Sequence, residues 1–311
     1  MSNPKIQFDF KRSLKIEGDN WLRIVEKLGE GGNGVVYLAL GTSGTINGHL
    51  YAIKMLKKID SDARRKKFHK EVKFLKLNNH PSIIPYRGFG GLKQDCPTTR
   101  VKHHIPFFVT DYLPFTMSDV IKEKNISTAE KSAYIVQLLS ALDHLSSLHS
   151  AVIHRDIKPK NIFIKGKTWL LGDFGLMTRD TPDHANLRGV LSESKNPAIP
   201  YKYRTPDLIA FEKNGNTLTP ASDIFQLGLV AAELFTGENP LVPTHNILDD
   251  IELKRIGSIP SSLGGSINSL ISRMLELDPK NRPTPKELLD PWREVFWVAA
   301  KMEINTNNRA M

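Results

Sequence analysis

The segment that decides the fold is His154-Arg155-Asp156-Ile157-Lys158-Pro159-Lys160-Asn161, and Asp173-Phe174-Gly175 follows it, beginning twelve residues after Asn161. An acid, basic side chains and an amide stand within eight positions, directly after an apolar stretch. The pairing of these two motifs indicates phosphoryl-transfer chemistry, and it predicts that other parts of that chemistry stand elsewhere in the chain.

Length and composition describe an ordinary globular chain. The 311 residues suffice for two lobes with their own cores or for one large domain. No segment approaches the roughly 20 apolar residues of a membrane span, so we expect a soluble, cytoplasmic protein with no membrane partner. The single cysteine, Cys96, excludes an internal disulfide and a Cys-rich zinc site.

The net charge of +10 is unevenly distributed. Ten lysine and arginine residues stand against three acids between Lys54 and Lys76. We interpret this run as a solvated helical face, with an acidic or phosphorylated partner as the alternative. Nucleic acid is disfavoured, because the run has few interleaved aromatic residues.

The N-terminal part has the pattern of an antiparallel sheet with one helix. Strands are expected at residues 21–28, 35–40, 50–56, 83–89 and 105–112. A helix is expected over residues 62–77, because Phe68, Val72 and Leu75 recur at the spacing of one buried face. A polar loop, residues 90–104, is expected between the last two strands.

Beyond Leu113-Pro114 the chain turns helical. Ser127 and Glu130 form a capping box for a helix to about Ser150. The helix after Thr219-Pro220 is apolar nearly all round and must be buried. A last helix starts at Thr284-Pro285 with Glu287. The expected domains are an N-terminal extension (1–20), an N-terminal lobe (21–113), a C-terminal lobe (114–297) and a polar tail (298–311).

Moving a terminal phosphoryl group requires positioning and charge neutralisation more than covalent help. The glycine-rich turn Gly29-Glu30-Gly31-Gly32-Asn33-Gly34 would let backbone amides approach phosphate closely. Alone it is also an ordinary hairpin turn. The strand that follows excludes the dinucleotide-binding alternative, which requires a helix there.

Charged residues elsewhere fit the same chemistry. Lys54 stands in an apolar strand, where a lysine is costly unless paired, and Glu71 on the next helix is the expected partner. Asp156, Asn161 and Asp173 supply oxygens of the kind that Mg²⁺ binds. Asp and Asn are also common turn residues, but the conjunction of independent motifs in this order favours function.

From about Trp21 to Trp297 the chain resembles the catalytic domain of eukaryotic-type protein kinases, specifically the serine/threonine family. The resemblance implies a bilobal α+β fold, with a five-stranded antiparallel N-terminal sheet plus one helix and a mainly helical C-terminal lobe. It implies ATP and Mg²⁺ as cofactors, and transfer of the γ-phosphate to serine or threonine hydroxyls of protein substrates, including the kinase itself.

The resemblance also assigns roles. Lys54 would hold the α and β phosphates, with Glu71 orienting it. Asp156 would accept the hydroxyl proton and Lys158 would steady the γ-phosphate. The implied Mg²⁺ ligands are Asn161 and Asp173. The implied nucleotide-binding residues are Gly29, Glu30, Gly31, Gly32, Asn33, Gly34, Val36, Ala52, Lys54, Thr110, Asp111, Leu113 and Phe163.

Two scaffold residues are implied as well. Asp223 would anchor the catalytic loop, residues 154–161. Arg282 would pair with the acid that closes the activation segment, residues 173–207. That acid is Asp207, one methylene shorter than the glutamate of the family pattern, and we expect the bridge to persist.

Two departures concern the substrate. Pro200 stands where serine/threonine kinases usually have threonine and resembles tyrosine kinases, whereas Lys158 is a serine/threonine signature. Lys160 replaces a glutamate that helps basophilic kinases bind an upstream arginine. Arginine is therefore expected to be disfavoured there, although Glu233, another acid of that site, is retained.

Regulation can also be predicted from the loop. Arg155 precedes the catalytic aspartate, as in kinases switched on by phosphorylation of the activation segment. We expect phosphorylated Ser192 or Ser194 to pair with Arg155. The alternative is a segment that packing alone keeps in order.

Two other functions are consistent with parts of the pattern: a pseudokinase scaffold, and a small-molecule kinase of the aminoglycoside or choline type. Pseudokinases usually lack a catalytic group, and none is missing here. Small-molecule kinases lack the Asp223 and Arg282 scaffold. The expected partners are protein substrates, with self-association for trans-autophosphorylation.

Overall fold

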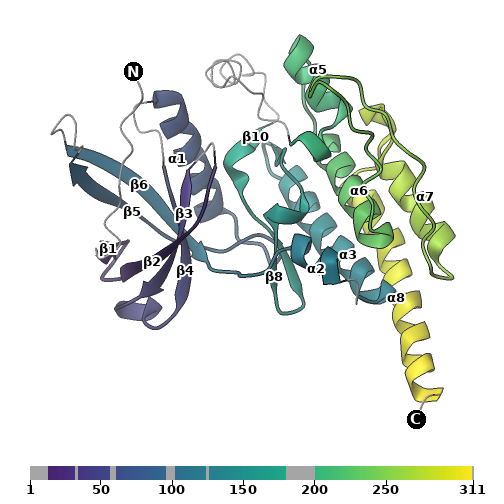
Figure 1. Cartoon of the computed structure of the whole chain (residues 1–311), viewed down its shortest axis with the longest axis horizontal. Helices are drawn as coiled ribbons and strands as arrows, with labels where there is room; N and C mark the ends of the chain where they lie inside the picture. The colour runs from purple at the N-terminus through teal and green to yellow at the C-terminus, as the bar shows by residue number, and fades with distance from the viewer. Residues whose placement is uncertain are drawn as a thin grey trace. The chain divides into compact units, whose positions relative to one another are not determined.

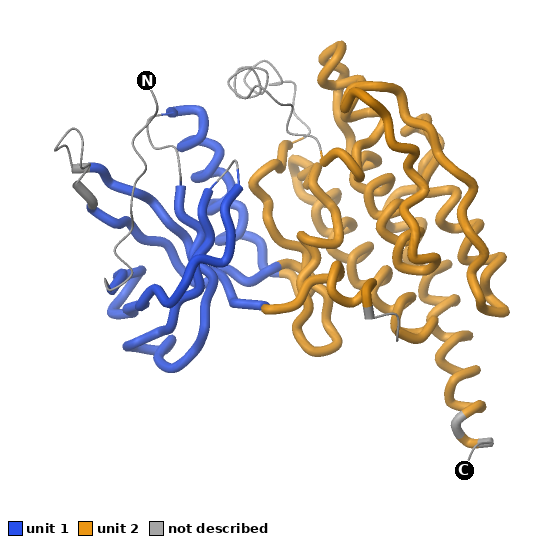
Figure 2. The backbone as a smooth tube through the Cα atoms, viewed as in Figure 1, with its two compact units in different colours: residues 1–79, 84–113 blue, residues 80–83, 114–311 orange. Residues whose placement is uncertain are grey.

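The computed structural model describes residues 13–31, 34–56, 61–95, 102–123, 126–179 and 200–309. The chain forms two compact units (Figures 1 and 2). The first comprises residues 1–79 and 84–113, and the second comprises residues 80–83 and 114–311. The residues of interest that lie outside the described ranges are Gly32, Asn33, Cys96, Ser192 and Ser194.

The first unit is built on a six-stranded antiparallel sheet in the order β1-β2-β3-β4-β6-β5. The strands are β1 (Ser13–Lys15), β2 (Trp21–Glu30), β3 (Val35–Gly41), β4 (Leu50–Met55), β5 (Tyr86–Asp95) and β6 (Lys102–Asp111). Five of these strands were expected. The sixth, β1, lies in residues assigned to an N-terminal extension, where Leu14 is buried and pairs with Leu22 of β2.

The strands β5 and β6 are longer than expected. Residues 90–104 were predicted as a polar loop, but Leu92 pairs with Ile105 and Asp95 pairs with Lys102. Ladder hydrogen bonds join backbone groups, so a strand can continue through polar residues that give no apolar alternation.

The helix α1 (Asp62–Leu77) matches its predicted range, and Phe68, Val72 and Leu75 are buried as predicted. Its cap is Ser61, whose hydroxyl accepts a hydrogen bond from the Arg64 N–H at 3.3 Å. Glu71 lies on the same buried face.

The second unit is mainly helical. Its helices are α2 (Met117–Glu123), α3 (Thr128–Ser146), α5 (Pro206–Asn214), α6 (Ala221–Thr236), α7 (Gly264–Met274) and α8 (Pro285–Arg309). Its short strands are β7 (Val152–Ile153), β8 (Ile162–Lys165), β9 (Thr168–Leu171) and β10 (Thr178–Arg179). Its 3₁₀ turns include η2 (Pro159–Asn161), η3 (Phe174–Leu176), η4 (Tyr201–Tyr203) and η5 (Pro279–Asn281).

The core of this unit is organised around α6, which contacts α3 and α7, while α8 packs along α3 (Figure 1). Most residues of α6 are buried, as its nearly uniform apolar sequence predicted. That environment requires every polar side chain of α6 to find a partner inside the protein.

Two capping predictions are confirmed. The Ser127 hydroxyl accepts from the Glu130 N–H at 3.1 Å, and α3 begins at the next residue. Thr284 and Glu287 bond reciprocally, at 2.8 Å and 3.2 Å, at the start of α8.

The end of α8 differs from its prediction as a polar tail over residues 298–311. The helix continues to Arg309. No proline or glycine interrupts it after Ala300, and the Glu303 carboxylate accepts the Ala129 N–H at 3.1 Å. A helix N-terminus favours an acid, so this contact ties the end of α8 to α3.

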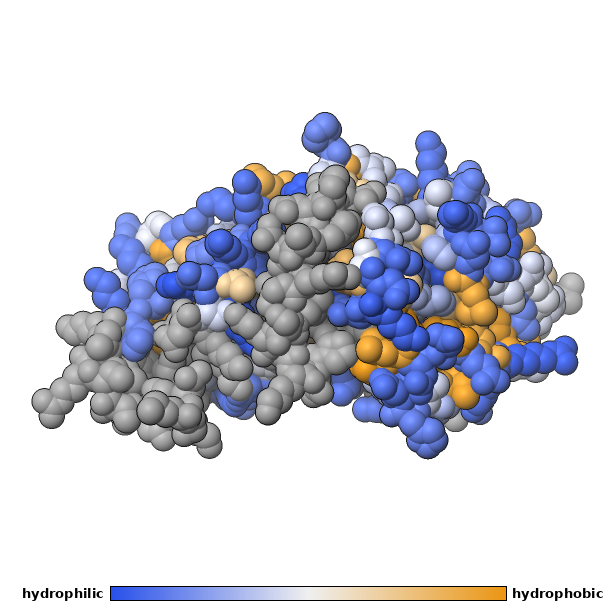
Figure 3. All heavy atoms as spheres, turned by 90° about the horizontal axis from the view of Figure 1, so that it is seen from above, coloured by the Kyte–Doolittle hydropathy of each residue, from blue (hydrophilic) through white to orange (hydrophobic). Residues whose placement is uncertain are grey.

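Hydrophilic residues cover most of the described surface on the face drawn in Figure 3, and apolar residues gather in one area of the second unit. Among the helices of the described ranges, none combines the length and apolarity needed to cross a membrane.

Candidate active site

A buried ion pair joins β4 to α1 in the first unit. The Lys54 Nζ atom lies 2.7 Å from Oε1 and 3.0 Å from Oε2 of Glu71. The Glu71 side chain is 3% exposed, and a buried carboxylate requires such a counter-charge. The Lys54 ammonium also lies 5.7 Å from the centre of the Phe108 ring. The pairing predicted from the sequence is therefore present.

Strand register places four predicted nucleotide-binding residues on one face of the sheet. Val36 lies opposite Lys54, and Ala52 lies opposite Thr110. Opposite residues of antiparallel strands point to the same side, as do residues two apart on one strand. The Val36, Ala52, Lys54 and Thr110 side chains therefore share a face.

The next residues continue from β6 toward the second unit. The Asp111 carboxylate accepts a hydrogen bond from Nη2 of Arg87 at 3.1 Å, and Leu113 is half-buried. Phe163 belongs to the second unit, where it is half-buried on β8 and pairs with Leu170.

The glycines of the β2–β3 turn are not equivalent. A Cβ atom on Gly34 would lie 2.5 Å from the Met55 carbonyl oxygen, so packing within the protein requires glycine there. A Cβ on Gly29 or Gly31 would meet nothing within 4 Å among the described residues. Protein packing does not explain these two glycines, whereas close approach of a phosphate-bearing ligand would.

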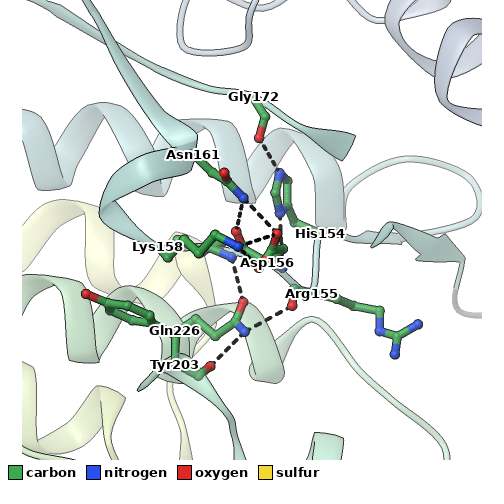
Figure 4. Close-up of polar contacts among 9 residues, drawn as sticks. His154, Arg155, Asp156, Lys158, Asn161, Gly172, Tyr203 and Gln226 are labelled. Carbon is green, nitrogen blue, oxygen red and sulfur yellow. Dashed lines mark hydrogen bonds and ion pairs between the residues drawn. The ribbon is translucent and has the colours of Figure 1, made fainter. Parts of the chain in front are cut away.

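The catalytic loop, residues 154–161, is pinned to α6 (Figure 4). The Asp223 carboxylate accepts the His154 N–H at 2.7 Å and the Arg155 N–H at 2.9 Å. Arg155 has a φ of +70°, a strained conformation for a residue with a side chain. Burial raises the pKa of Asp223 to about 7, and the two amide hydrogen bonds oppose that rise. The anchoring predicted for Asp223 is confirmed.

A second anchor was not predicted. Gln226 also bonds the loop backbone from α6 and is fully buried. The signal was present in the sequence, because a lone amide in a helix that is otherwise almost wholly apolar must serve a buried partner.

The Asp156 carboxylate is held by two neighbours. Lys158 Nζ lies 2.8 Å from Oδ1 and 2.9 Å from Oδ2, and the Asn161 amide donates to Oδ2 at 2.8 Å. Burial raises the pKa of Asp156, Asp173 raises it further, and Lys158 and Asn161 oppose the rise. The Asp156 carboxylate is therefore held in one orientation, and the residue is only 5% exposed.

The oxygen atoms of the Asn161 and Asp173 side chains are ligands of the kind that Mg²⁺ binds. The Asn161 amide nitrogen donates hydrogen bonds to the backbone oxygen and to the carboxylate of Asp156, each at 2.8 Å. The side-chain carbonyl oxygen of Asn161 is the atom that could bind a metal ion. Asp173 is exposed, has a left-handed φ of +57°, and its charge acts on Asp156. A divalent cation would relieve that repulsion between carboxylates.

Asn161 and Asp173 would supply only part of the coordination shell of a metal ion. The described residues contain no cluster of three or more His, Cys, Asp and Glu side chains that could hold a metal. Mg²⁺ commonly uses one or two protein ligands together with water and substrate phosphates, so the sparse set suits it.

The Arg155 side chain points away from the Asp156 carboxylate (Figure 4). Its Nη2 lies 3.5 Å from the Glu212 carboxylate of α5, and its guanidinium lies 5.2 Å from the centre of the Phe211 ring. Burial lowers the pKa of Arg155. The negative charges of Glu212, Asp223 and Asp156 oppose this lowering. The predicted phosphoserine partners of Arg155 lie outside the described residues, whereas Glu212 was not predicted.

The bridge between Asp207 and Arg282 persists despite the shorter acid. Nη1 of Arg282 lies 2.8 Å from Oδ1 of Asp207, and both side chains are buried. The guanidinium also donates to the Glu276, Leu277 and Ala221 carbonyls and stacks at 4.8 Å over Phe225. This network joins the start of α5 to the start of α6 and to the segment before α8.

Glu233 has a partner within the protein. The Tyr203 hydroxyl donates to its carboxylate, and burial together with Glu233 raises the pKa of Tyr203. Lys160 and Lys202 are exposed. The exposed charges of the catalytic loop and of residues 200–203 are therefore positive, and Glu233 is already bonded to Tyr203.

Comparison with known proteins agrees with this arrangement. A family model described as the protein kinase domain matches residues 22–292. A "Probable serine/threonine-protein kinase" of Dictyostelium discoideum is 30% identical over 86% of this chain and 15% of its own length. Mitogen-activated protein kinase 18 of Arabidopsis thaliana is 29% identical over 88% of this chain and 48% of its length. Mitogen-activated protein kinase 4 of Rattus norvegicus is 30% identical over 73% of this chain and 81% of its own length.

The chain thus spans less than half the length of two of these relatives. The match nevertheless covers both units, and the family takes ATP and Mg²⁺ and acts on protein substrates. The mainly antiparallel first unit and the helical second unit are those of this family's fold. The chain belongs to the protein kinase domain family.

Proposed function

We propose that this chain is an active ATP- and Mg²⁺-dependent kinase that phosphorylates serine and threonine hydroxyls of proteins. The observation that carries the proposal is the Asp156 carboxylate, which Lys158 and Asn161 orient on a loop pinned from beneath by α6. A carboxylate held in this way can accept the proton of an attacking hydroxyl.

The nucleotide roles follow from the family pattern. In the first unit, the glycine-rich turn and the shared face of Val36, Ala52 and Thr110 would take ATP, with Lys54 on its phosphates. In the second unit, Phe163 would contact the adenine, and Asn161 and Asp173 would hold Mg²⁺, which neutralises phosphate charge. No atom of the described residues would lie within 4 Å of a Cβ on Gly29 or Gly31, which supports this assignment.

The pseudokinase alternative is disfavoured, because none of the expected catalytic groups is missing and the Lys54–Glu71 and Asp156–Lys158 pairs are formed. The small-molecule kinase alternative is disfavoured by the Asp207–Arg282 and Asp223 scaffold.

The choice of serine and threonine rests on Lys158, which contacts Asp156 directly. Pro200, which resembles tyrosine kinases, leads into η4 and has no such contact with the loop carboxylate among the described residues. Separation of the phosphoamino acids after acid hydrolysis of the product would distinguish phosphoserine and phosphothreonine from phosphotyrosine.

The test uses ATP labelled at the γ-phosphate, with a mixed serine, threonine and tyrosine peptide library as acceptor. We expect Mg²⁺-dependent label on serine and threonine, and on the protein itself, which chelation of Mg²⁺ abolishes. Label on tyrosine alone would contradict the acceptor assignment. The absence of any protein-bound label under these conditions would contradict the kinase proposal.

Substrate preference is expected to follow Lys160. Replacing Lys160 with glutamate should raise kcat/KM for peptides with arginine upstream of the acceptor by about 2- to 5-fold, the effect of one exposed charge pair. Lys167→Glu, which reverses a charge on the β8–β9 turn, is the matched control and should change little. A strong arginine preference in the unmodified protein would contradict this expectation.

Location and self-association are the remaining parts of the proposal. We place the protein in the cytoplasm, where a reducing environment suits its single cysteine. Autophosphorylation would proceed in trans, between two copies. A rate per enzyme that rises with enzyme concentration would support this order of reaction.

A further inference from the structure

The side chain of Gln226 bonds three backbone groups that lie far from it in sequence (Figure 4). Its Oε1 accepts the Ile157 N–H at 2.9 Å, and its Nε2 donates to the Arg155 carbonyl at 3.1 Å and to the Tyr203 carbonyl at 2.9 Å. The side chain is fully buried. An amide has two donor hydrogens and one acceptor oxygen, so Gln226 uses all of its polar groups.

The partners of Gln226 have specific places. Arg155 and Ile157 are the chain neighbours of Asp156 on either side. Tyr203 ends η4, and we define residues 200–203 as the acceptor segment, since Pro200 occupies the family position that distinguishes hydroxyl acceptors. Gln226 therefore joins the backbone on both sides of Asp156 to the acceptor segment.

Asp223 and Gln226, both on α6, bond different backbone groups. They stand three residues apart, on neighbouring positions of one helix face. Asp223 binds the N–H groups of His154 and Arg155 and thereby holds the start of the loop. Of these two side chains, only Gln226 also bonds the acceptor segment.

We infer that Gln226 is a positioning residue that fixes the acceptor segment relative to the Asp156 carboxylate. Transfer to a protein hydroxyl depends on both ends of this bridge, whereas transfer to water depends only on the end at the catalytic loop and nucleotide binding depends on neither. The inference rests on the proposed kinase function. Its physical basis is that small displacements between a general base and its acceptor cost large factors in rate.

The test compares Gln226→Met with Gln137→Met. Methionine is similar in length but makes no amide hydrogen bonds. Gln137 is the matched control, because its amide also bonds two backbone groups, Lys167 O at 3.1 Å and Trp169 N at 2.7 Å, away from the acceptor segment. The readouts are peptide phosphorylation, ATP hydrolysis without peptide, affinity for an ATP analogue, and melting temperature.

We expect Gln226→Met to lower kcat/KM for a serine peptide by about 10- to 100-fold, the scale of a modest misplacement of reacting groups. Its affinity for the ATP analogue should stay within about threefold of that of the unmodified protein, and its ATP hydrolysis should fall by a smaller factor than its peptide phosphorylation, because water needs no acceptor segment. Gln137→Met should phosphorylate peptide normally. Equal losses of peptide phosphorylation and ATP hydrolysis, or equal behaviour of both variants, would overturn the inference.

A second variant tests the hydrogen bonds themselves and serves if Gln226→Met does not fold. In Gln226→Glu, a protonated carboxyl can accept from Ile157 and donate to one carbonyl, whereas the ionised form faces two carbonyl oxygens. We expect peptide phosphorylation, relative to the unmodified protein, to fall as pH rises, with ATP hydrolysis changing less. A flat ratio would overturn the inference. An unmodified protein that labels no peptide would instead contradict the kinase proposal.

Discussion

Replacing Asp156 with asparagine is expected to lower phosphoryl transfer to protein by about 10²- to 10⁴-fold, the range for loss of a general base. Asparagine preserves the shape of the side chain, but its amide has no proton-accepting carboxylate. The same change removes the counter-charge of Lys158, which lies 2.8 Å from the carboxylate. Affinity for an ATP analogue should change much less than transfer, because Asp156 bonds none of the residues assigned to the adenine or to the α and β phosphates.

The measurement is incorporation of γ-phosphate label into peptide by the unmodified protein and by Asp156→Asn, with melting temperatures in parallel. Asp119→Asn is the control, since it removes a carboxylate that bonds Thr116 at the start of α2, outside the catalytic loop. An Asp156→Asn protein that is folded and retains more than about a tenth of the activity would exclude Asp156 as the general base.

Replacing Arg282 with methionine is expected to lower the free energy of unfolding by about 3–5 kcal/mol, as for other buried ion pairs broken on one side. The change would leave the Asp207 carboxylate buried without its cation. It would also strip three backbone carbonyls of a donor. The expected result is a large drop in melting temperature, measured together with denaturant unfolding.

The control for this change is Arg293→Met. Arg293 pairs with Asp290 at the same 2.8 Å, but their side chains are 51% and 87% exposed, so its loss should cost no more than about 1 kcal/mol. The double variant Asp207→Asn with Arg282→Met should recover part of the loss, because no unpaired buried charge remains. Equal destabilisation by Arg282→Met and Arg293→Met would contradict the structural role.

Residue types and short-range spacing predicted much of the architecture. Phe68, Val72 and Leu75 predicted the buried face of α1, and Thr284 with Glu287 predicted the start of α8. These signals are local, because helix periodicity and capping involve groups within one or two turns. The Lys54–Glu71 pair was predictable for a different reason, since a charge in an apolar context requires a partner. The Asp207–Arg282 pair was predicted from the resemblance to the family.

The errors lie where backbone geometry, rather than side-chain pattern, decides the outcome. The strand β1, the extension of β5 and β6, and the end of α8 all contain polar residues without clear periodicity. The strands form their hydrogen bonds with neighbouring strands, and the end of α8 contacts α3 through Glu303. A sequence pattern carries no record of such neighbours.

By itself the sequence determined the family and predicted the catalytic groups and the need for buried counter-charges, because each of these depends on which side chains are present and how closely they are spaced. Only the tertiary structure decided which distant groups meet. Gln226 bonds residues 69 and 71 positions away on the catalytic loop, Glu212 approaches Arg155, and Tyr203 bonds Glu233. The contacts of Gln226 and Glu233 exist because packing of the buried helix α6 brings separate segments of the chain within hydrogen-bonding distance, which no local pattern encodes.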